Sequence, residues 1–378
     1  NAGATSLSTS SIGTITLNGK ATGIWNAVRI GEAGLVAGTG LISLTGTSLY
    51  SGSYDGVRLE GTTSINTSGA LTINGTGGSA HYGVWMSGTG SINAAGDITI
   101  NGQNTSTNWG VYLDNGYNIK TTAGNISLTG SGAGGIYSYA NLLAGNAATP
   151  TSGGGITVNA TANSSSYGLE VTTSSLVSYG PISLTGTSAG AHGVIVHGAN
   201  AKVQSASGIT INGAGTWGLT LYDNAIIQST GGNIGITANG TTGGLYIDST
   251  IGHILASNMT VAPTTATPTA GGTLTINAST SSSGQGALIY NGSLISYGAM
   301  SLTTRGRGGS QGLYVGGTGA FKSVGDLTID AATTGASWGM QLESGRVIQS
   351  TAGNVSVTGV GDYGVYMNGS IVASNDTA

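Results

Sequence analysis

The chain has 378 residues, of which 71 are glycine, 4 are proline and none is cysteine, and only 6% are charged, for a net charge of −4. So few lysine and arginine residues exclude a phosphate-binding nucleic-acid surface, and the lack of cysteine excludes disulfides and thiolate metal sites. Collagen is excluded because the glycines keep no three-residue register, and abundant β-branched residues argue against disorder.

A short phrase recurs thirteen times along the chain: an apolar residue, a small polar one, a second apolar one, then Asn, Thr or Asp, usually followed by Gly. The copies are 25 to 30 residues apart, except for one gap of 40. They begin at Ile15, Ile42, Leu71, Ile98, Ile126, Ile156, Ile182, Ile209, Ile234, Leu274, Met300, Leu327 and Val355.

Two further phrases follow the first in most repeats. The second is Gly, apolar, variable, apolar, as in Gly83-Val84-Trp85-Met86, and a looser third phrase closes the unit, as in Ile227-Gln228-Ser229. Each phrase alternates with the period of a β-strand and is bounded by turn-forming residues. Each repeat therefore predicts three short strands separated by Gly-rich turns, the first turn directly after the Asn or Thr.

Repeats of this size without a helical period predict an all-β fold, a right-handed parallel β-helix of about 13 coils of about 27 residues with three short strands per coil. Coils stacked at the spacing of paired strands would make a rod roughly 60 Å long. Inward columns of Ile, Leu and Val would form its core, and one coil could not bury its apolar face alone. We expect a single continuous solenoid segment over residues 1–378.

Two insertions interrupt the repeat, near residues 142–154 and 256–272. Pro150 and Pro268 are 118 residues apart, the same offset that separates the repeated strings 175–180 and 293–298, so the insertions occupy equivalent coils of a duplicated block. The second also contains Pro263. Both are expected to protrude from the same side, either as neutral surface loops or as binding loops.

Chemistry-bearing residues are sparse. The carboxylates are scattered; Asp330 fits a turn residue in place of Asn, and Asp55 and Glu60 fit solvated flanks of a strand. His192 and His197 are predicted on opposite faces of one strand, which disfavours a shared metal. Matches to nucleophile-elbow and dinucleotide motifs do not lead into helices. The sequence therefore predicts no catalytic residue, no metal site and no cofactor, and its short apolar runs predict no membrane insertion.

Aromatic residues recur at the outward position of the second phrase, two residues after its Gly. They could stack on sugar rings, reinforce the coils as a ladder of aromatic pairs, or pack rods side by side. The candidate glycan-stacking residues are Trp25, Trp85, Tyr112, Tyr137, Tyr246, Tyr314 and Tyr366.

Outward Thr, Ser and Asn residues of the first phrase form a second set of rows. They resemble the rows of ice-binding solenoids, but their identity changes between coils and Gly235 interrupts them. Hydrogen-bonded polar ladders that reinforce the stack are the better prediction.

The phrases Gly96-Asp97-Ile98-Thr99-Ile100-Asn101 and Gly124-Asn125-Ile126-Ser127-Leu128-Thr129 resemble those of filamentous-haemagglutinin-type exoproteins. These are large β-helical proteins that Gram-negative bacteria secrete through a dedicated outer-membrane partner. The resemblance implies an extracellular or cell-surface location, adhesion or filament formation, and host or cell-surface glycans as partners.

The expected function is an extracellular structural rod of a large surface adhesin or filament, without catalysis. The alternatives are a glycan-binding module that uses the outward aromatic residues and a β-helical polysaccharide-degrading enzyme. Both ends stop within the repeat without a capping coil, so we expect an interior segment of a longer chain or a subunit that associates end to end.

Overall fold

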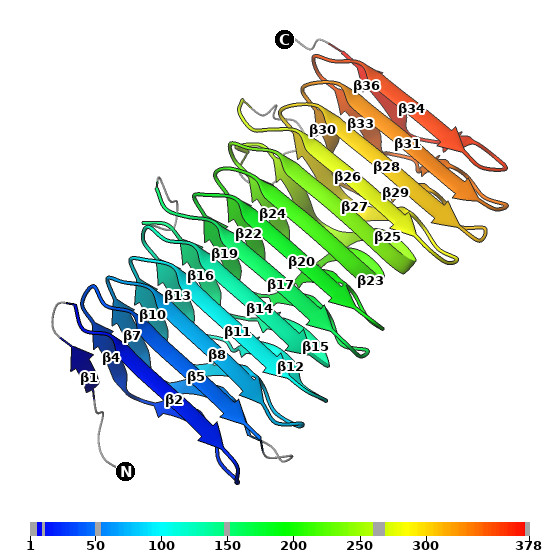
Figure 1. Ribbon diagram of the computed structural model, residues 1–378. Coiled ribbons are helices and arrows are strands. Elements are labelled where there is room, and N and C mark those ends of the chain that lie inside the picture. The colour runs from blue at the N-terminus through cyan, green and yellow to red at the C-terminus, as the bar shows by residue number, and fades with distance from the viewer. Residues whose placement is uncertain (1–5, 10–11, 50–53, 147–151, 260–268, 375–378) are drawn as a thin grey trace. The chain divides into compact units, whose positions relative to one another are not determined.

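The computed structural model describes residues 6–9, 12–49, 54–146, 152–259 and 269–374, and its regular elements are all β-strands (Figure 1). The chain divides into two compact units, Asn1–Ala191 and His192–Ala378. Both are parallel β-solenoids built from three strands per coil, and the thirteen repeats of about 27 residues correspond to thirteen coils. The all-β solenoid prediction is thus confirmed. None of the described residues forms a helix that could cross a membrane.

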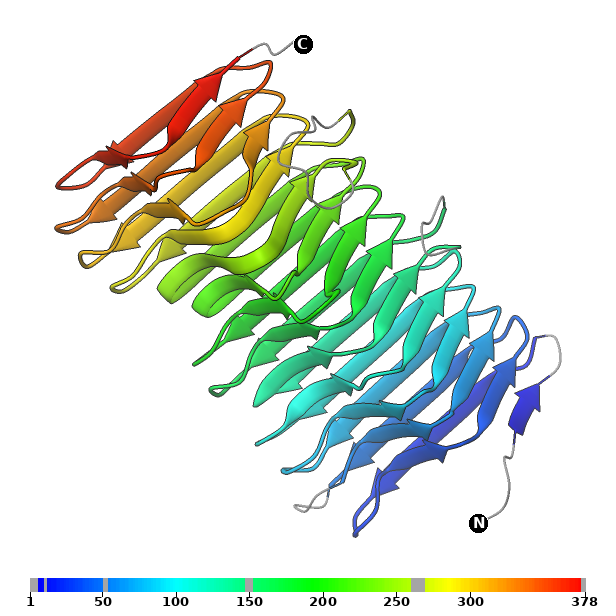
Figure 2. The ribbon, with the colours of Figure 1, turned by 180° about the vertical axis from the view of Figure 1, so that it is seen from behind.

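We call the three sides of each solenoid the first, second and third face, after the phrase that supplies their strands. Figures 1 and 2 show the strands of a face side by side in coil order within each unit. In the first unit, the first face consists of β2 (Ile15–Ala21), β5 (Ile42–Ser48), β8 (Leu71–Gly77), β11 (Ile98–Asn104), β14 (Ile126–Gly132), β17 (Ile156–Ala162) and β20 (Ile182–Ser188). The second face consists of β3 (Val28–Gly31), β6 (Val57–Gly61), β9 (Val84–Gly88), β12 (Trp109–Leu113), β15 (Gly134–Ser138) and β18 (Leu169–Thr172). The third face consists of β1 (Ser6–Thr9), β4 (Gly34–Ala37), β7 (Ser64–Thr67), β10 (Ser91–Ala94), β13 (Asn118–Thr121), β16 (Asn141–Ala144) and β19 (Ser175–Ser178).

In the second unit three strands continue around corners. They are β23 (Ile209–Tyr222) over the first and second faces, β25 (Ile234–Ala256) over all three, and β27 (Ala287–Ser296) over the second and third. The other first-face strands are β26 (Leu274–Thr280), β28 (Met300–Arg307), β31 (Leu327–Thr334) and β34 (Val355–Val360). The other second-face strands are β21 (Val194–His197), β29 (Leu313–Gly316), β32 (Met340–Leu342) and β35 (Val365–Met367). The other third-face strands are β22 (Lys202–Ser205), β24 (Ile226–Ser229), β30 (Phe321–Ser323), β33 (Val347–Ser350) and β36 (Ser370–Ala373).

The core consists of inward side chains from all three faces. In one coil, Ile98 and Ile100 on β11, Val111 and Leu113 on β12, and Ile119 on β13 are all fully buried. Each such side chain contributes roughly 1.5–3 kcal/mol. Parallel pairing sets Ile98 beside the equivalent apolar residues of the neighbouring coils, so the core is a set of continuous columns.

The first-face strands are longer than predicted. β11 has seven residues, and the glycine after its Asn, Gly102, lies inside the strand and faces the core. A side chain at Gly102 would overlap the backbone of Gly110 on the second face. The predicted turn directly after the Asn or Thr is therefore wrong, because glycine here permits two faces to approach closely. Asp330 accordingly lies within β31, not in a turn, and its carboxylate is 2.6 Å from the Arg305 guanidinium.

The glycine that opens the second phrase has a related role. A methyl group on Gly83 would overlap the backbone of Gln103, which belongs to the first face of the next coil. The same conflict recurs at Gly56 and Gly110. This position thus requires glycine for close backbone contact between successive coils.

The insertions are described only at their bases, since residues 147–151 and 260–268, with Pro150, Pro263 and Pro268, lie outside the described residues. Gly153 and Gly271 have φ angles of 131° and 140° at the same place in their coils, which supports the predicted equivalence of the insertions. The expected protrusion of the two insertions concerns mainly these residues outside the described ranges. Met259 folds back against the third face and packs on Leu255 and Ile295.

Candidate functional site

The outward positions of the second face form a row that is unusually rich in aromatic and charged residues in the first unit. Parallel register places the members of this row on adjacent strands, from β3 to β18. In coil order they are Arg29, Arg58, Trp85, Tyr112, Tyr137 and Glu170. We call this set the aromatic row.

The rings of the aromatic row stack along the direction in which the coils repeat. The Arg58 guanidinium carbon lies 3.8 Å from the centroid of a Trp85 ring. Tyr82 lies between Trp85 and Tyr112, with centroid distances of 5.3 Å and 4.7 Å. Tyr112 and Tyr137 are stacked at 4.5 Å with an interplanar angle of 9°. Neighbouring side chains therefore cover ring faces that a sugar would otherwise need for stacking.

Burial affects the ionisation of these tyrosines. It raises the pKa of Tyr82 and Tyr112, and the proximity of Tyr112 raises that of Tyr82 further. The pKa of Tyr137 is also raised, first by burial and then by the neighbouring Tyr112. The phenols of the row are consequently neutral hydrogen-bonding groups near neutral pH.

Trp25 is not part of the aromatic row. It lies in the connection between β2 and β3, and 67% of its surface is exposed. Its assignment to the second phrase is wrong, because the strand begins at Val28 and Arg29 takes the outward position. The sequence Gly23-Ile24-Trp25 imitates the phrase within a loop.

The remaining candidates lie in the second unit, each in its own surroundings. Tyr246 is 5.1 Å from Trp217 and 5.6 Å from Tyr222, and its hydroxyl donates to the Asp248 carboxylate at 2.9 Å. Burial and this carboxylate raise the pKa of Tyr246 to about 12.

Tyr314 and Tyr366 complete the seven candidates. Tyr314 lies on β29, where its ring lies against Gly316. Tyr366 on β35 lies 5.2 Å from Trp338. The structure thus brings only Trp85, Tyr112 and Tyr137 of the seven into one contiguous row.

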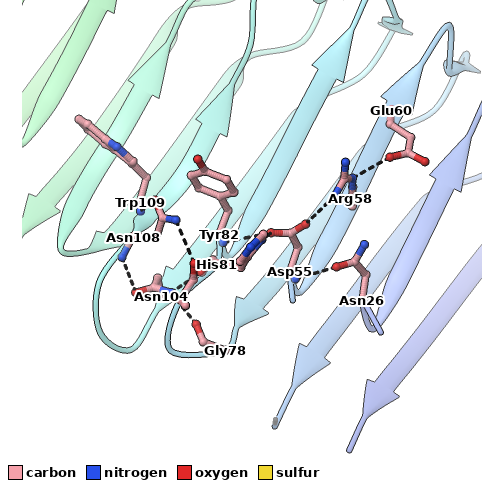
Figure 3. Close-up of polar contacts among 11 residues, drawn as sticks. Asn26, Asp55, Arg58, Glu60, Gly78, His81, Tyr82, Asn104, Asn108 and Trp109 are labelled. Carbon is pink, nitrogen blue, oxygen red and sulfur yellow. Dashed lines mark hydrogen bonds and ion pairs between the residues drawn. The ribbon is translucent and has the colours of Figure 1, made fainter. Parts of the chain in front are cut away.

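A buried carboxylate lies beside the aromatic row, at the corner between the first and second faces (Figure 3). Asp55 is fully buried, and its Oδ1 accepts hydrogen bonds from His81 Nδ1 and the Tyr82 backbone N–H, both at 3.1 Å. Its own backbone N–H donates to Asn26 Oδ1 at 2.8 Å, and its Oδ2 lies 3.7 Å from Arg58 Nη1. Burial raises the pKa of the Asp55 carboxyl, whereas His81 and Arg58 oppose that shift.

Two asparagines extend this polar contact into the next coil. Asn104 Nδ2 donates to the carbonyls of Gly78, at 2.7 Å, and His81, and Asn108 Nδ2 donates to the carbonyl of Ala80 at 3.1 Å. Figure 3 shows these side chains reaching from one loop to the next. We call Asn26, Asp55, His81, Asn104 and Asn108 the corner network; it links the loops of four successive coils.

The interpretation of Asp55 and Glu60 as solvated flanks is wrong. Asp55 is buried, and Glu60 bridges two arginines, with 2.7 Å from Oε1 to Arg29 Nε and 2.7 Å from Oε2 to Arg58 Nε. The missed signal is register: Asp55 directly precedes the glycine of its second phrase, the place that Asn26 and Tyr82 hold relative to their strands.

The corner network resembles part of a catalytic site in one respect, since a buried carboxylate orients an imidazole through Nδ1. Its remaining contacts are with the Arg58 guanidinium and with backbone groups and asparagines of neighbouring loops, an arrangement that fixes loop positions. Within the described ranges, no three His, Asp or Glu residues cluster so as to hold a metal ion.

Amide side chains form further contacts from coil to coil. Asn93 donates to Asn66 at 3.0 Å on the third face of the first unit, and Asn101 donates to Asn74 at 2.9 Å on its first face. The polar ladder predicted for the first phrase is confirmed at Asn74 and Asn101, whereas the third-face pair was not predicted.

No model of a known protein family matches the chain, and no curated protein or solved structure matches it.

Proposed function

We propose that the chain is an extracellular structural rod, part of a large surface adhesin or filament of the filamentous-haemagglutinin type, and that it carries out no catalysis. The observation that carries this proposal is that outward side chains contact one another from coil to coil. Arg58, Trp85, Tyr112 and Tyr137 cover one another across coils, and Asp55 binds the next loop. Such contacts stabilise the stack itself.

The repeat style and composition also support this proposal. A chain with 6% charged residues and no cysteine suits export in an unfolded state followed by folding outside the cell. Stacked coils suit a spacer that holds an adhesive element away from a surface, because each coil contacts only its neighbours and length can grow by repetition.

Surface labelling tests the location. Antibodies raised against the purified chain should label intact cells of the source bacterium, and protease added outside should remove the signal. Labelling only after cell lysis would contradict the proposal. Sustained release of reducing ends from any polysaccharide by the purified chain would contradict its non-catalytic part.

A second candidate function is glycan binding, and one observation favours it. In a chain with few charges, Arg29, Arg58 and Glu60 gather beside Trp85 on adjacent strands. Sugars can bind where aromatic side chains lie next to charged groups that form hydrogen bonds. A broad glycan array probed with the chain and with a variant lacking the aromatic side chains of Trp85, Tyr112 and Tyr137 tests it: binding that only this folded variant loses would support the candidate.

A further inference from the structure

The third face of the first unit carries a hollow away from the aromatic row. It has a volume of about 430 Å³ and lies over β4, β7 and β10, which Figure 1 labels as successive strands. The hollow is shallow and open to solvent, so it suits a ligand that lies along the surface. The hollow is lined wholly by described residues of the first unit.

The lining carries no charged residue. Its outward row contains Val36, Asn66 and Asn93, in parallel register on the three strands, and Ser68 and Thr122 contribute from the adjoining corner. The absence of carboxylates and cations from this lining disfavours a metal ion, a phosphate or a charged peptide as ligand. Side-chain amides and hydroxyls that both donate and accept suit a ligand with many hydroxyl groups.

The two amides are held in a fixed orientation. Asn93 Nδ2 donates to Asn66 Oδ1 at 3.0 Å, which leaves the Asn66 amino group as a donor and the Asn93 carbonyl as an acceptor for a ligand. Val36 is 41% exposed and supplies an apolar surface beside them. A pyranose presents the matching combination of hydroxyls and an apolar C–H face.

The second unit shows that an amide in this row can hold oxygen ligands. Gln228 occupies the same position of its third-face strand and donates through Nε2 to the carbonyls of Ser257, at 3.0 Å, and Met259, at 2.6 Å. There the ligand is a segment of the chain itself. In the first unit the equivalent row forms the open hollow.

We propose that this hollow binds an uncharged saccharide, through Asn66, Asn93 and the apolar surface of Val36. This inference rests on the second candidate function, glycan binding, and moves the site from the aromatic row to the third face. A peptide added as an extra strand is disfavoured, because β4, β7 and β10 are each paired on both sides and offer no free edge.

Binding of neutral oligosaccharides to variants of the full chain tests the proposal. The probes are tetramers of glucose, mannose, galactose and N-acetylglucosamine, screened on an array and then titrated by calorimetry. Ala95→Trp, which fills the hollow, and the double variant Asn66→Leu/Asn93→Leu, which removes the amides, should each weaken binding about tenfold or more. A cooperative thermal unfolding transition would show that each variant is folded.

Lys120→Ala is the matched control, because Lys120 follows Asn93 in the same row but lies outside the lining. It should bind as the unmodified chain does. Binding that survives both hollow variants and disappears without Trp85, Tyr112 and Tyr137 would overturn this inference and leave glycan binding intact. The inference would be overturned if the unmodified chain bound no neutral oligosaccharide, or bound only acidic sugars or extended peptides. If it bound no glycan at all, the second candidate function would be overturned as well.

Discussion

Large side chains in this solenoid lie over glycines at the same place in a neighbouring coil. The Trp109 indole occupies the space that a Cβ on Gly134 would need, and Tyr117 does the same at Gly90. Arg346, which is 1% exposed, reaches from one coil toward Gly319, whose carbonyl accepts a hydrogen bond from it at 2.8 Å. Glycine in one repeat therefore makes room for a bulky residue in the next, and this pairing fixes which coils can be neighbours.

Gly134→Ala tests this pairing. The new methyl group would collide with the Trp109 ring, so we expect a loss of about 2 kcal/mol in the free energy of unfolding, the cost of overpacking a filled site. Denaturant unfolding followed by Trp fluorescence measures it. Gly235→Ala is the matched control, because nothing lies within 4 Å of a Cβ there, and it should be neutral or stabilising by about 0.5–1 kcal/mol. Equal effects of the two substitutions would contradict the pairing.

His253 gives the fold a predicted sensitivity to acid. It is 4% exposed, neither ring nitrogen has a hydrogen-bond partner among the described residues, and burial lowers its pKa below the ordinary value of 6.5. The unfolded chain then takes up the proton first, so stability is complete above pH 6.5 and falls as the pH drops toward the folded pKa.

His253→Leu should remove part of this dependence while keeping the site apolar. We expect a flatter profile of unfolding free energy between pH 7 and pH 5 for the variant than for the unmodified chain. His192, whose pKa burial also lowers, should keep its own acid response in both proteins. Parallel profiles would show that His253 is not the source.

At the scale of elements, outward rows bind the strands of a face together. On the second face of the first unit the row is aromatic, with Tyr112 stacked on Tyr137, and on the third face it is an amide pair, Asn66 with Asn93. Cross-strand pairs of these kinds contribute about 0.2–1 kcal/mol each, and aromatic pairs up to about 1.5 kcal/mol. Their sum along a face supplements the core columns.

The partly buried tyrosines of both units also predict a response to alkali. Burial raises the pKa of Tyr112 and Tyr137, and that of Tyr246 to about 12, above the ordinary value of 10. The unfolded chain loses these protons first, so their stabilising effect is complete below pH 10 and is lost as the pH rises toward the folded values. Unfolding free energy should fall between pH 10 and pH 12, with phenolate absorbance appearing as the chain unfolds. Full ionisation of the native tyrosines near pH 10 would contradict this.

Most of the strand pattern could be predicted from the sequence, because inward Ile, Leu and Val recur with a period of two in every repeat. The length of the first-face strands could not be predicted, because glycine is common both in turns and at close contacts between faces. The sequence alone does not show which role Gly102 has. The burial of Asp55 and the loop position of Trp25 could not be predicted for a related reason. Whether a residue is buried against the next coil depends on register between repeats, and the pattern within one repeat does not contain that register.

At the scale of the whole molecule, both units are built from coils of three strands, but their outward side chains differ. The first unit combines the aromatic row, the corner network and the open hollow of its third face. In the second unit the chain covers part of its own third face, where Gln228 holds the start of an insertion and Met259 packs on Leu255. Repetition supplies the scaffold, and departures from the repeat give each unit its surface.

The central claim is that the outward aromatic residues serve the stack, and the variant lacking the aromatic side chains of Trp85, Tyr112 and Tyr137 tests it most directly. Removing these three should lower the unfolding free energy of the first unit by about 4 kcal/mol, from several ring contacts of about 1 kcal/mol each. In the variant, Trp25 and Trp109 remain as fluorescent reporters in this unit, and Trp217 and Trp338 remain in the second unit. The matched control Thr72→Ala/Thr99→Ala/Ser127→Ala changes outward residues of the first face and should shift stability by less than about 1 kcal/mol.

Urea unfolding of the unmodified chain and both triple variants, monitored by fluorescence, is the decisive measurement. The account predicts a first-unit transition at clearly lower urea for the aromatic variant and an almost unchanged one for the control. An aromatic variant as stable as the unmodified chain would contradict the account.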